Sequence, residues 1–305
     1  MNIRNVALIG AGAIGAYLIW SFEGADDVTF TVAAEGARKE RLERDGITIN
    51  GERHSLQVQR PDQAGPQDLI FIATKYGALD AAIAMLPPLV GPDTLILSLL
   101  NGVDSEEQIA QAVGKEHLIY SVIRIASHRT QAGIRFDPER VIGLSFGLPN
   151  AGPDDQPKLE ALSDLFAGTR LRWHQSDDIL TDIWMKFAAN IANNLPQAVI
   201  GAPAGLYLKS EHGLFLARKL WSEVAVVAAL QGVRLPEEVL IFPGQSTSAK
   251  YSTLQDLEAG RHTEIDMFAG HMLHLAEKAG IEVPYCEYTY HAIKALEEKN
   301  DGLFE

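Results

Sequence analysis

The chain has little cysteine and no long apolar run among its 305 residues. Its single cysteine, Cys286, excludes an internal disulfide and a metal site built from several cysteines, and it suits a reducing compartment. The most apolar long segment, 214–230, is interrupted by charged residues, so we expect no membrane span. The opening residues MNIRNVALIG enter a strand-like run at once, so we expect no signal peptide. We therefore expect a cytoplasmic protein without a membrane partner.

Positive charge is also in short supply. The chain has 26 Lys and Arg against 40 Asp and Glu, which gives a net charge of −14 at pH 7. This balance does not suit non-specific nucleic-acid binding, which needs a basic surface. It still allows a phosphate to be bound locally, because backbone N–H groups at a helix N-terminus can hold one whatever the overall charge.

The first part of the chain alternates short apolar runs with helix-like stretches, which is typical of βαβ units and a parallel sheet. Runs such as LIFIA and LILSLL suit strands that are covered on both faces. Residues 46–58 are typical of a hairpin with Asn50-Gly51 as its turn. We predict strands at 6–9, 28–33, 69–73, 94–99, 118–126, 133–136, 141–146 and 170–173, and helices at 13–22, 35–44, 78–86, 105–113 and 158–166.

After residue 177 the strand patterns give way to long helical ones. We predict helices at 178–195, 212–231, 263–279 and 285–299. The expected fold class is therefore α/β. A Rossmann-type, doubly wound sheet occupies residues 1–176, and an all-helical domain for the substrate occupies residues 177–305.

Gly10, Gly12 and Gly15 form a G-x-G-x-x-G motif between the first predicted strand and the first predicted helix. In a dinucleotide-binding turn these glycines provide a tight turn, close approach of the backbone to a pyrophosphate, and close packing of helix on strand. The helix that begins with Ala13 and Ile14 presents N–H groups and a partial positive charge to the phosphates. The strand–turn–helix context favours a dinucleotide site over a glycine turn with a purely structural role.

The end of the second predicted strand bears on which dinucleotide is bound. Glu35 lies 20 residues after Gly15, where an acid that bonds the ribose hydroxyls of NAD is expected. Arg38, Lys39 and Arg41 follow at once, and cations there would suit the additional phosphate of NADP. The same charges would also suit the solvated first turn of a helix. These residues leave NAD and NADP both open.

The segment WMKFAANIANNLP at 184–196 carries Lys186, Asn190 and Asn194 at intervals of four residues, so they share one face of a helix. Reduction of a ketone needs a hydride and a proton for the developing alkoxide, and a partly desolvated lysine can supply that proton. The carboxamides can bond the hydroxyl and carboxylate oxygens of a substrate. The spacing alone describes a solvated surface stripe equally well.

Two further groups of polar residues accompany this face. The segment 251–266 offers Ser252 for a carboxylate, and Glu264 for the lysine or for a substrate hydroxyl; read alone, it is also a capped helix start with surface charges. Lys75 and Asn101 each follow a predicted strand, and ligands of open α/β sheets gather at the carboxyl ends of strands. Ordinary turn chemistry is the alternative for both.

Together these residues make the chain resemble the ketopantoate reductase family (2-dehydropantoate 2-reductases) over nearly its whole length. This family makes pantoate on the way to pantothenate and coenzyme A. Its members join a Rossmann domain to an all-helical domain, with the active site in the cleft between them. The resemblance therefore implies reduction of the 2-oxo acid 2-dehydropantoate with NADPH. It rests on GAGAIG at 10–15, ATK at 73–75, LLNG at 99–102, the K-x3-N-x3-N of Lys186, Asn190 and Asn194, and the S-x3-D-x7-E of Ser252, Asp256 and Glu264.

The resemblance also implies a role for each matching residue of the catalytic and substrate-binding set. Lys186 would be the general acid that protonates the carbonyl oxygen of the substrate. Asn190, Asn194 and Glu264 would hold the hydroxyl and carbonyl region of ketopantoate. Ser252 would hold the carboxylate.

For the cofactor, the resemblance places Lys75 and Asn101 beside the reacting end. One departure from the family stands out, because many members carry an arginine at the end of the second strand for the NADP phosphate. This sequence reads Ala33-Ala34-Glu35 there. NADP is thus expected only if Arg38 takes over that role, and NAD is not excluded.

Other interpretations concern the substrate and the class of protein. A related reductase could act on a different 2-oxo acid, and a non-catalytic sensor could bind the dinucleotide and report redox state. His271, His274 and Glu277 lie at helical spacing, but hydride transfer from a nicotinamide needs no metal, so an amphipathic helix is expected and no metal site. The sequence leaves the oligomeric state open, with a homodimer as one option.

Overall fold

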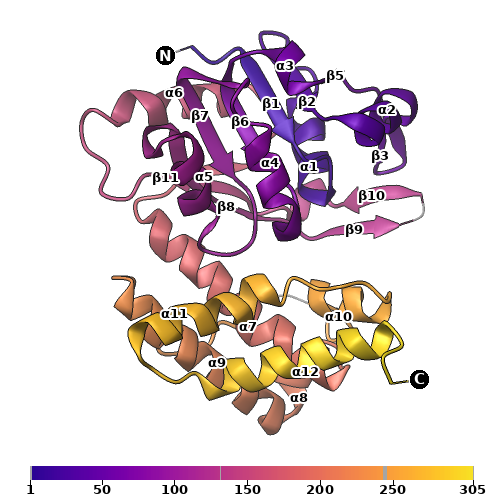
Figure 1. Cartoon of the computed structure of the whole chain (residues 1–305), viewed down its shortest axis with the longest axis vertical. Coiled ribbons are helices and arrows are strands. Elements are labelled where there is room, and N and C mark those ends of the chain that lie inside the picture. Colours follow the sequence, from indigo (N-terminus) through magenta and orange to yellow (C-terminus); the bar gives the residue numbers. More distant parts are fainter. Residues whose placement is uncertain (1, 131, 243–245, 305) are drawn as a thin grey trace. The chain divides into compact units, whose positions relative to one another are not determined.

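The computed structural model describes residues 2–130, 132–242 and 246–304 (Figure 1). The chain divides into two compact units, Met1–Asp182 and Ile183–Glu305. The division falls inside a helix, α7 (Ile179–Ile200). No helix among the described residues is long and apolar enough to cross a membrane.

The first unit is built on an eight-stranded sheet in the order β12-β11-β8-β7-β6-β1-β2-β5 (Figure 1). All neighbouring strands in it are parallel except β8 and β11. This parallel-rich sheet with its helices confirms the predicted Rossmann-type architecture. The strands are β1 (Asn5–Ile9), β2 (Thr29–Ala33), β5 (Val58–Gln59), β6 (Gln67–Ile72), β7 (Val90–Ser98), β8 (Leu118–Arg124), β11 (Gly143–Gly147) and β12 (Trp173–Gln175).

Each central strand buries both of its faces, because successive side chains alternate across the sheet. Val6 and Leu8 pack in a core with helices α1 (Ala13–Phe22) and α6 (Gln156–Ala167). Ala7 and Ile9 pack in a second core with α4 (Leu79–Ala84) and α5 (Ser105–Val113). Burial on both sides explains why these strands appear in the sequence as continuous apolar runs. The remaining helices of this unit are α2 (Gly36–Asp45) and α3 (Pro61–Ala64), with short 3₁₀ turns at Tyr76–Ala78, Lys115–His117 and Pro138–Arg140.

A second, smaller sheet in this unit has the order β4-β3-β10-β9. Its β3–β4 hairpin turns at Asn50 and Gly51, both with positive φ (52° and 93°), as a two-residue type I′ turn requires. The predicted hairpin is therefore confirmed. The strands are β3 (Ile47–Ile49), β4 (Glu52–His54), β9 (Ser127–Thr130) and β10 (Gly133–Phe136).

The described residues of the second unit form helices and connecting loops without a strand, as predicted. Trp221, Phe187 and Phe268 are its largest fully buried side chains. Its helices, besides α7, are α8 (Gly205–Lys209), α9 (Glu211–Leu230), α10 (Ser252–Glu258), a π-helical turn at Asp266–Gly270, α11 (His271–Ala279) and α12 (Pro284–Asn300).

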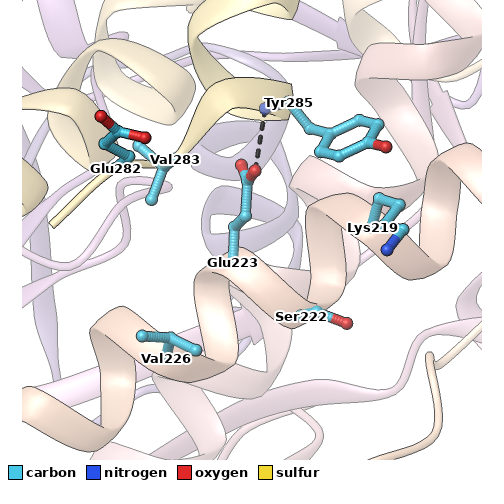
Figure 2. Close-up of a pocket in the computed structure, with 7 residues that line it drawn as sticks. All are labelled: Lys219, Ser222, Glu223, Val226, Glu282, Val283 and Tyr285. Atoms are coloured by element: carbon cyan, nitrogen blue, oxygen red, sulfur yellow. Dashed lines mark hydrogen bonds between the residues drawn. The ribbon is translucent and has the colours of Figure 1, made fainter.

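The start of α12 is held by a side chain from another helix. The carboxylate of Glu223, on α9, accepts the backbone N–H of Tyr285 (Figure 2) and that of Cys286, both at 2.8 Å. These are two of the N–H groups that a helix leaves without an intrahelical partner at its N-terminus. A half-buried acid of α9 thus fixes where α12 begins.

Two helix predictions need correction. Helix α7 continues through Pro196 to Ile200, whereas the sequence predicted its end at 195. The buried neighbours Leu195 and Gln197 are both fully inaccessible, and such packing outweighs the cost of about 3 kcal/mol that an interior proline imposes. The single helix predicted over 263–279 is a π-helical turn followed by α11.

Candidate active site

The glycine loop follows β1, and each of its three glycines is required for a different reason. A Cβ on Gly10, whose φ is +104°, would lie 2.5 Å from the carbonyl oxygen of Ala73. A Cβ on Gly15 would lie 2.1 Å from the carbonyl oxygen of Gly10. A Cβ on Gly12 would meet only Ala73, at 3.9 Å, which is ordinary contact. The protein's own packing therefore requires Gly10 and Gly15, while Gly12 keeps open the space above the loop.

That space is a pocket of about 470 Å³ at the carboxyl ends of β1, β2 and β6. Helix α1 begins at its edge with Gly12 as N-cap, and its first turn carries no acidic residue and no capping side-chain bond among the described residues. Its N–H groups are thus available to an anion. Residues along the pocket wall are Ile9 to Gly12, Val32 to Glu35, Arg38, Leu42, Ala73 to Lys75, Ala78, Ala81, Ala82 and Met85.

The pocket fits a dinucleotide. Its floor is backbone at Gly10 and Gly12, which lets a pyrophosphate approach closely. In its wall, the buried hydroxyl oxygen of Thr74 has no hydrogen-bond partner among the described residues. A buried polar atom left in that state costs free energy, so it is a natural partner for a polar ligand atom.

The two residues that bear on the choice of dinucleotide lie on this pocket together. Arg38, on α2, is half-buried, and its Nη2 donates to the carbonyl oxygen of Ala11 at 2.9 Å. This bond holds the guanidinium against the glycine loop. Glu35 is exposed, at the N-cap of α2. The pocket therefore offers both a cation for an added phosphate and an acid for ribose hydroxyls.

The loops after β6 and β7 are joined by a cluster that the sequence did not reveal. The hydroxyl of Tyr76 donates to Asp104 Oδ2 at 2.5 Å, and Gln108 Nε2 donates to the same oxygen at 2.7 Å. Burial, with the hydrogen bond to Asp104, raises the pKa of Tyr76 to about 12, so the phenol stays protonated. The cluster ties the segment after Lys75, which lies on the pocket, to the loop of Asn101, which lies outside the described pocket wall.

In the helical unit, the predicted polar face lies on α7. Lys186 and Asn190 are half-buried, and Asn194 is 4% exposed. The side-chain oxygen of Asn194 has no hydrogen-bond partner among the described residues. A hydroxyl or another donor of a bound ligand would relieve that cost.

Two buried residues of α7, Asn193 and Gln197, bond distant segments of the unit, which their spacing in the sequence did not indicate. Asn193 Nδ2 donates to the carbonyl oxygen of Leu240 at 2.9 Å. Gln197 Oε1 accepts the backbone N–H of Tyr251 at 2.6 Å. Because Ser252 is the first residue of α10, Gln197 fixes the chain immediately before it. Ser252 itself is exposed, and so reaches solvent-borne ligands without rearrangement.

The other predicted residue of this unit, Glu264, is half-buried in the loop between α10 and the π-helical turn. Asp256 supports that loop, because its Oδ1 accepts Arg261 Nε at 2.8 Å. The rings of His271 and His274 are 6.3 Å apart. No group of three or more metal-ligating side chains is found in the part of the chain that the structure describes.

Comparison with known proteins agrees with this architecture. The model of the family described as ketopantoate reductase PanE/ApbA matches residues 6–136, and the model of its C-terminal domain matches residues 178–297. An uncharacterized oxidoreductase, YkpB, of Bacillus subtilis is 28% identical over 95% of this chain and 98% of its own. A 2-dehydropantoate 2-reductase of Mesorhizobium japonicum is 27% identical over 86% of this chain and 88% of its own.

Among solved structures, a D-mandelate dehydrogenase with NADH and anilino(oxo)acetate superposes with a TM-score of 0.85. The match covers 98% of this chain and 99% of that one at 22% identity, which shows a shared fold. The two family models together span both units of the chain and confirm the resemblance predicted from its motifs. The protein is an oxidoreductase that belongs to the ketopantoate reductase family.

Proposed function

We propose that this protein reduces 2-dehydropantoate to pantoate with NADPH, the step that feeds pantothenate and coenzyme A synthesis. The observation that carries the proposal is the polar face of α7 in a chain of this family. It sets an ammonium, Lys186, in line with two carboxamides, and the buried oxygen of Asn194 has no partner among the described residues. Such a face suits a substrate that carries a carbonyl, a hydroxyl and a carboxylate.

In the proposed reaction, a bound nicotinamide supplies a hydride to the carbonyl carbon. Lys186 Nζ gives a proton to the carbonyl oxygen as it becomes an alkoxide, and takes a proton back from solvent afterwards. One oxo acid, one NADPH and one proton thus become one hydroxy acid and one NADP⁺. Asn190, Asn194 and Glu264 orient the hydroxyl and carbonyl region, and Ser252 bonds the carboxylate.

The cofactor is held in the first unit by the glycine loop and the N-terminus of α1. Gly10, Gly12 and Gly15 shape the turn, and Ala13 and Ile14 begin the helix that faces the phosphates. Lys75 and Asn101 border the reacting end.

For the choice of cofactor, we assign to Arg38 the additional phosphate of NADPH. Its support is the bond to Ala11, which keeps the guanidinium on the pocket although the end of β2 lacks an arginine. Arg38→Ala should raise the KM for NADPH by about tenfold to a hundredfold and change that for NADH little, since a hydrogen bond to a charged group is worth about 1.5–3 kcal/mol. Arg44→Ala, an exposed arginine in the last turn of the same helix, is the matched control. Equal losses for NADPH and NADH in Arg38→Ala would contradict the assignment.

The substrate assignment is tested by following cofactor oxidation with ketopantoate and with other 2-oxo acids, each with NADPH and NADH. The expected result is the highest kcat/KM for ketopantoate with NADPH. The likeness to the D-mandelate dehydrogenase over nearly the whole chain favours one alternative, an aromatic 2-oxo acid reduced with NADH. A preference for benzoylformate would establish that alternative. Tight cofactor binding without oxidation by any oxo acid would leave the sensor hypothesis.

A further inference from the structure

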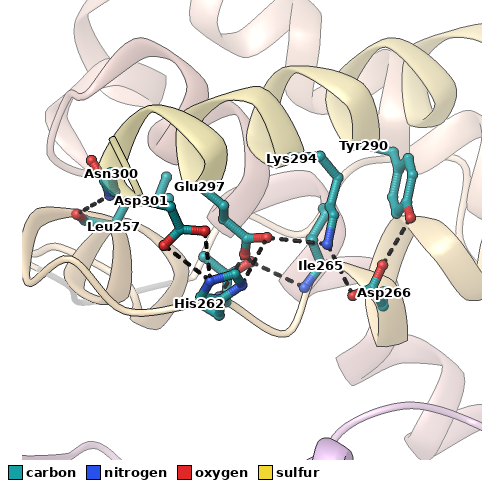
Figure 3. Close-up of polar contacts among 10 residues, drawn as sticks. Leu257, His262, Ile265, Asp266, Tyr290, Lys294, Glu297, Asn300 and Asp301 are labelled. Carbon is teal, nitrogen blue, oxygen red and sulfur yellow. Dashed lines mark hydrogen bonds and ion pairs between the residues drawn. The ribbon is translucent and has the colours of Figure 1, made fainter. Parts of the chain in front are cut away.

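The loop that carries Glu264 is fastened on both sides to one face of the C-terminal helix α12 (Figure 3). Tyr290, Lys294 and Glu297 lie on that face at spacings of four and three residues. They bond residues that precede and follow Glu264 in the chain, not residues within α12 alone.

Glu297 is the buried member of the three, at 3% exposed. Its Oε1 accepts the backbone N–H of Thr263 at 2.6 Å and the hydroxyl of Thr263 at 2.7 Å. Its Oε2 lies 3.3 Å from Lys294 Nζ and 3.6 Å from His262 Nδ1. The carboxylate of Glu297 therefore contacts His262 and Thr263, the two residues directly before Glu264, and Lys294.

Thr263, which Glu297 holds, in turn bonds the backbone that follows it. Its hydroxyl oxygen accepts the N–H of Ile265 at 3.1 Å while its proton goes to Glu297. The carbonyl oxygen of Glu264 in turn accepts the N–H groups of Met267 and Phe268, both at 3.1 Å, at the entry to the π-helical turn. The peptide unit that follows Glu264 is thus held at its carbonyl and its N–H, and the one that precedes Thr263 is held by Glu297. Together these bonds restrict the direction of the Cα–Cβ bond of Glu264.

The far side of the loop is fastened by the same helix. Asp266 accepts the hydroxyl of Tyr290 at 2.8 Å and lies 3.4 Å from Lys294 Nζ. On the near side, His262 lies 3.1 Å from a carboxylate oxygen of Asp301, the residue directly after α12. These groups are exposed or half-buried, so their bonds are worth less than those of the buried Glu297.

We propose that Glu297 is a positioning residue for the reaction: through Thr263 it holds the side chain of Glu264 in the orientation that the substrate hydroxyl requires. This inference rests on the proposed function, in which Glu264 contacts the substrate. Glu297 lies far along the chain from every motif of the family resemblance, and its carboxylate is occupied by the loop rather than by a ligand.

The test combines Glu297→Ala, Glu264→Gln and the double variant in the full-length enzyme with ketopantoate and NADPH. Glu298→Ala, an exposed glutamate next along α12, is the matched control. Thr263→Val removes only the hydroxyl that joins Glu297 to the loop, and it replaces Glu297→Ala in the test if that variant fails to fold. Hydrogen exchange of the peptide that spans residues 259–266 reports the loop without reference to activity.

If Glu297 acts through Glu264, Glu297→Ala should lower kcat/KM by about tenfold to a hundredfold, the usual penalty of a misplaced contact group. The Kd for NADPH should stay unchanged, and exchange at Thr263 and Ile265 should speed up. In the Glu264→Gln background the same change should cost less than about twofold, because the two residues serve one contact. If Glu297→Ala only disturbed the fold, its loss of kcat/KM and that of Glu264→Gln would multiply in the double variant.

The outcomes separate the two proposals. If Glu264→Gln is impaired while Glu297→Ala behaves like Glu298→Ala, or while the two losses multiply, the positioning role is overturned and the proposed function stands. If Glu264→Gln retains the wild-type kcat/KM, the substrate role of Glu264 fails, and the positioning role fails with it.

Discussion

The two units build their candidate sites from opposite materials. In the first unit the floor of the pocket is backbone at Gly10 and Gly12, and Gly12 leaves room above it that would suit a phosphate. In the helical unit the site is made of long polar side chains, which buried acceptors such as Gln197 and Glu297 hold from outside. A site of the first kind is damaged by adding atoms, and a site of the second kind by removing them. Variants of each kind can break or sharpen this comparison.

The largest effect is expected from removing the ammonium of Lys186. Lys186→Ala should lower kcat by about a hundredfold to ten-thousandfold, the usual contribution of a general acid. The Kd for NADPH should change little, because the cofactor pocket lies within the other unit. Stopped-flow and steady-state assays with NADPH measure the two quantities.

Two further lysine variants make this prediction specific. Lys186→Arg keeps the positive charge but cannot release a proton at neutral pH, so it should be nearly as slow as the alanine variant. Lys209→Ala, at an exposed position of the same unit, should be as active as the wild type. An active Lys186→Arg enzyme would reduce the role of Lys186 to electrostatics.

In the backbone site, two alanine substitutions three residues apart should fail in different ways. Gly15→Ala places a Cβ 2.1 Å from the Gly10 carbonyl oxygen and 3.3 Å from Leu8, so it should destabilise the fold by about 3 kcal/mol. Gly12→Ala meets nothing closer than 3.9 Å in the protein, so the Tm should stay within a degree or two of the wild type. Its affinity for NADPH should nevertheless fall by about tenfold to a hundredfold.

Thermal unfolding without cofactor and fluorescence titration with NADPH check the pair. A Gly12→Ala protein that binds NADPH normally would mean that the phosphates do not approach the loop at that residue. The backbone interpretation of the first unit would then lose its support.

The sequence could predict those parts of the two candidate sites that depend on residues close together in the chain. The glycine loop and the α7 face depend on residues within a few positions of one another, so their spacing alone indicated a turn and a helix face. The bonds Gln197–Tyr251 and Glu297–Thr263 join residues 54 and 34 positions apart, and no local pattern marks such partners. Similarly, Pro196 indicated a helix end because its local cost is visible in the sequence, whereas the packing that outweighs it is not.

The smaller elements were missed for a related reason. Strands β5 and β9 are two and four residues long, and each exists because a neighbouring strand, β2 or β10, supplies its hydrogen bonds. Helix α10 begins at Ser252, within the segment 251–266 that the sequence also allowed as a capped helix start. Its seven residues are too few to be stable without its contacts with α12. In each case the tertiary partner, rather than the intrinsic propensity, determines the structure.

The smallest effect expected concerns a buried acid in the first unit, Glu106, which can be compared with Glu297 in the second. Glu106 is 5% exposed at the start of α5, where Ser105 Oγ donates to its Oε2 at 2.9 Å. Burial raises its pKa from 4.5 to about 7. Whereas Glu297 has a lysine and a histidine beside it, hydroxyl and backbone donors only partly offset the cost of burying a charge at Glu106.

The pH dependence of stability follows from that shift. Below pH 4.5 Glu106 is protonated in both the folded and the unfolded chain, so folding loses nothing. Between pH 4.5 and about 7 the unfolded chain releases the proton while the folded chain retains it, so the free energy of unfolding falls as pH rises. Glu106→Gln removes this term. Relative to the wild type, the variant should therefore gain about 2 kcal/mol in unfolding free energy between pH 5 and pH 8.

Urea denaturation of both proteins at pH 5 and pH 8 measures the difference, with Glu107→Gln, the exposed neighbour, as control. A gain of the same size in Glu107→Gln would assign the effect to surface charge instead. An unfolding free-energy difference between Glu106→Gln and the wild type that is equal at the two pH values would mean that Glu106 is ionised in the folded protein throughout. In that case side chains of the first unit would also stabilise a buried charge, as those around Glu297 do in the second unit. The difference between the two units would then be limited to their candidate ligand sites.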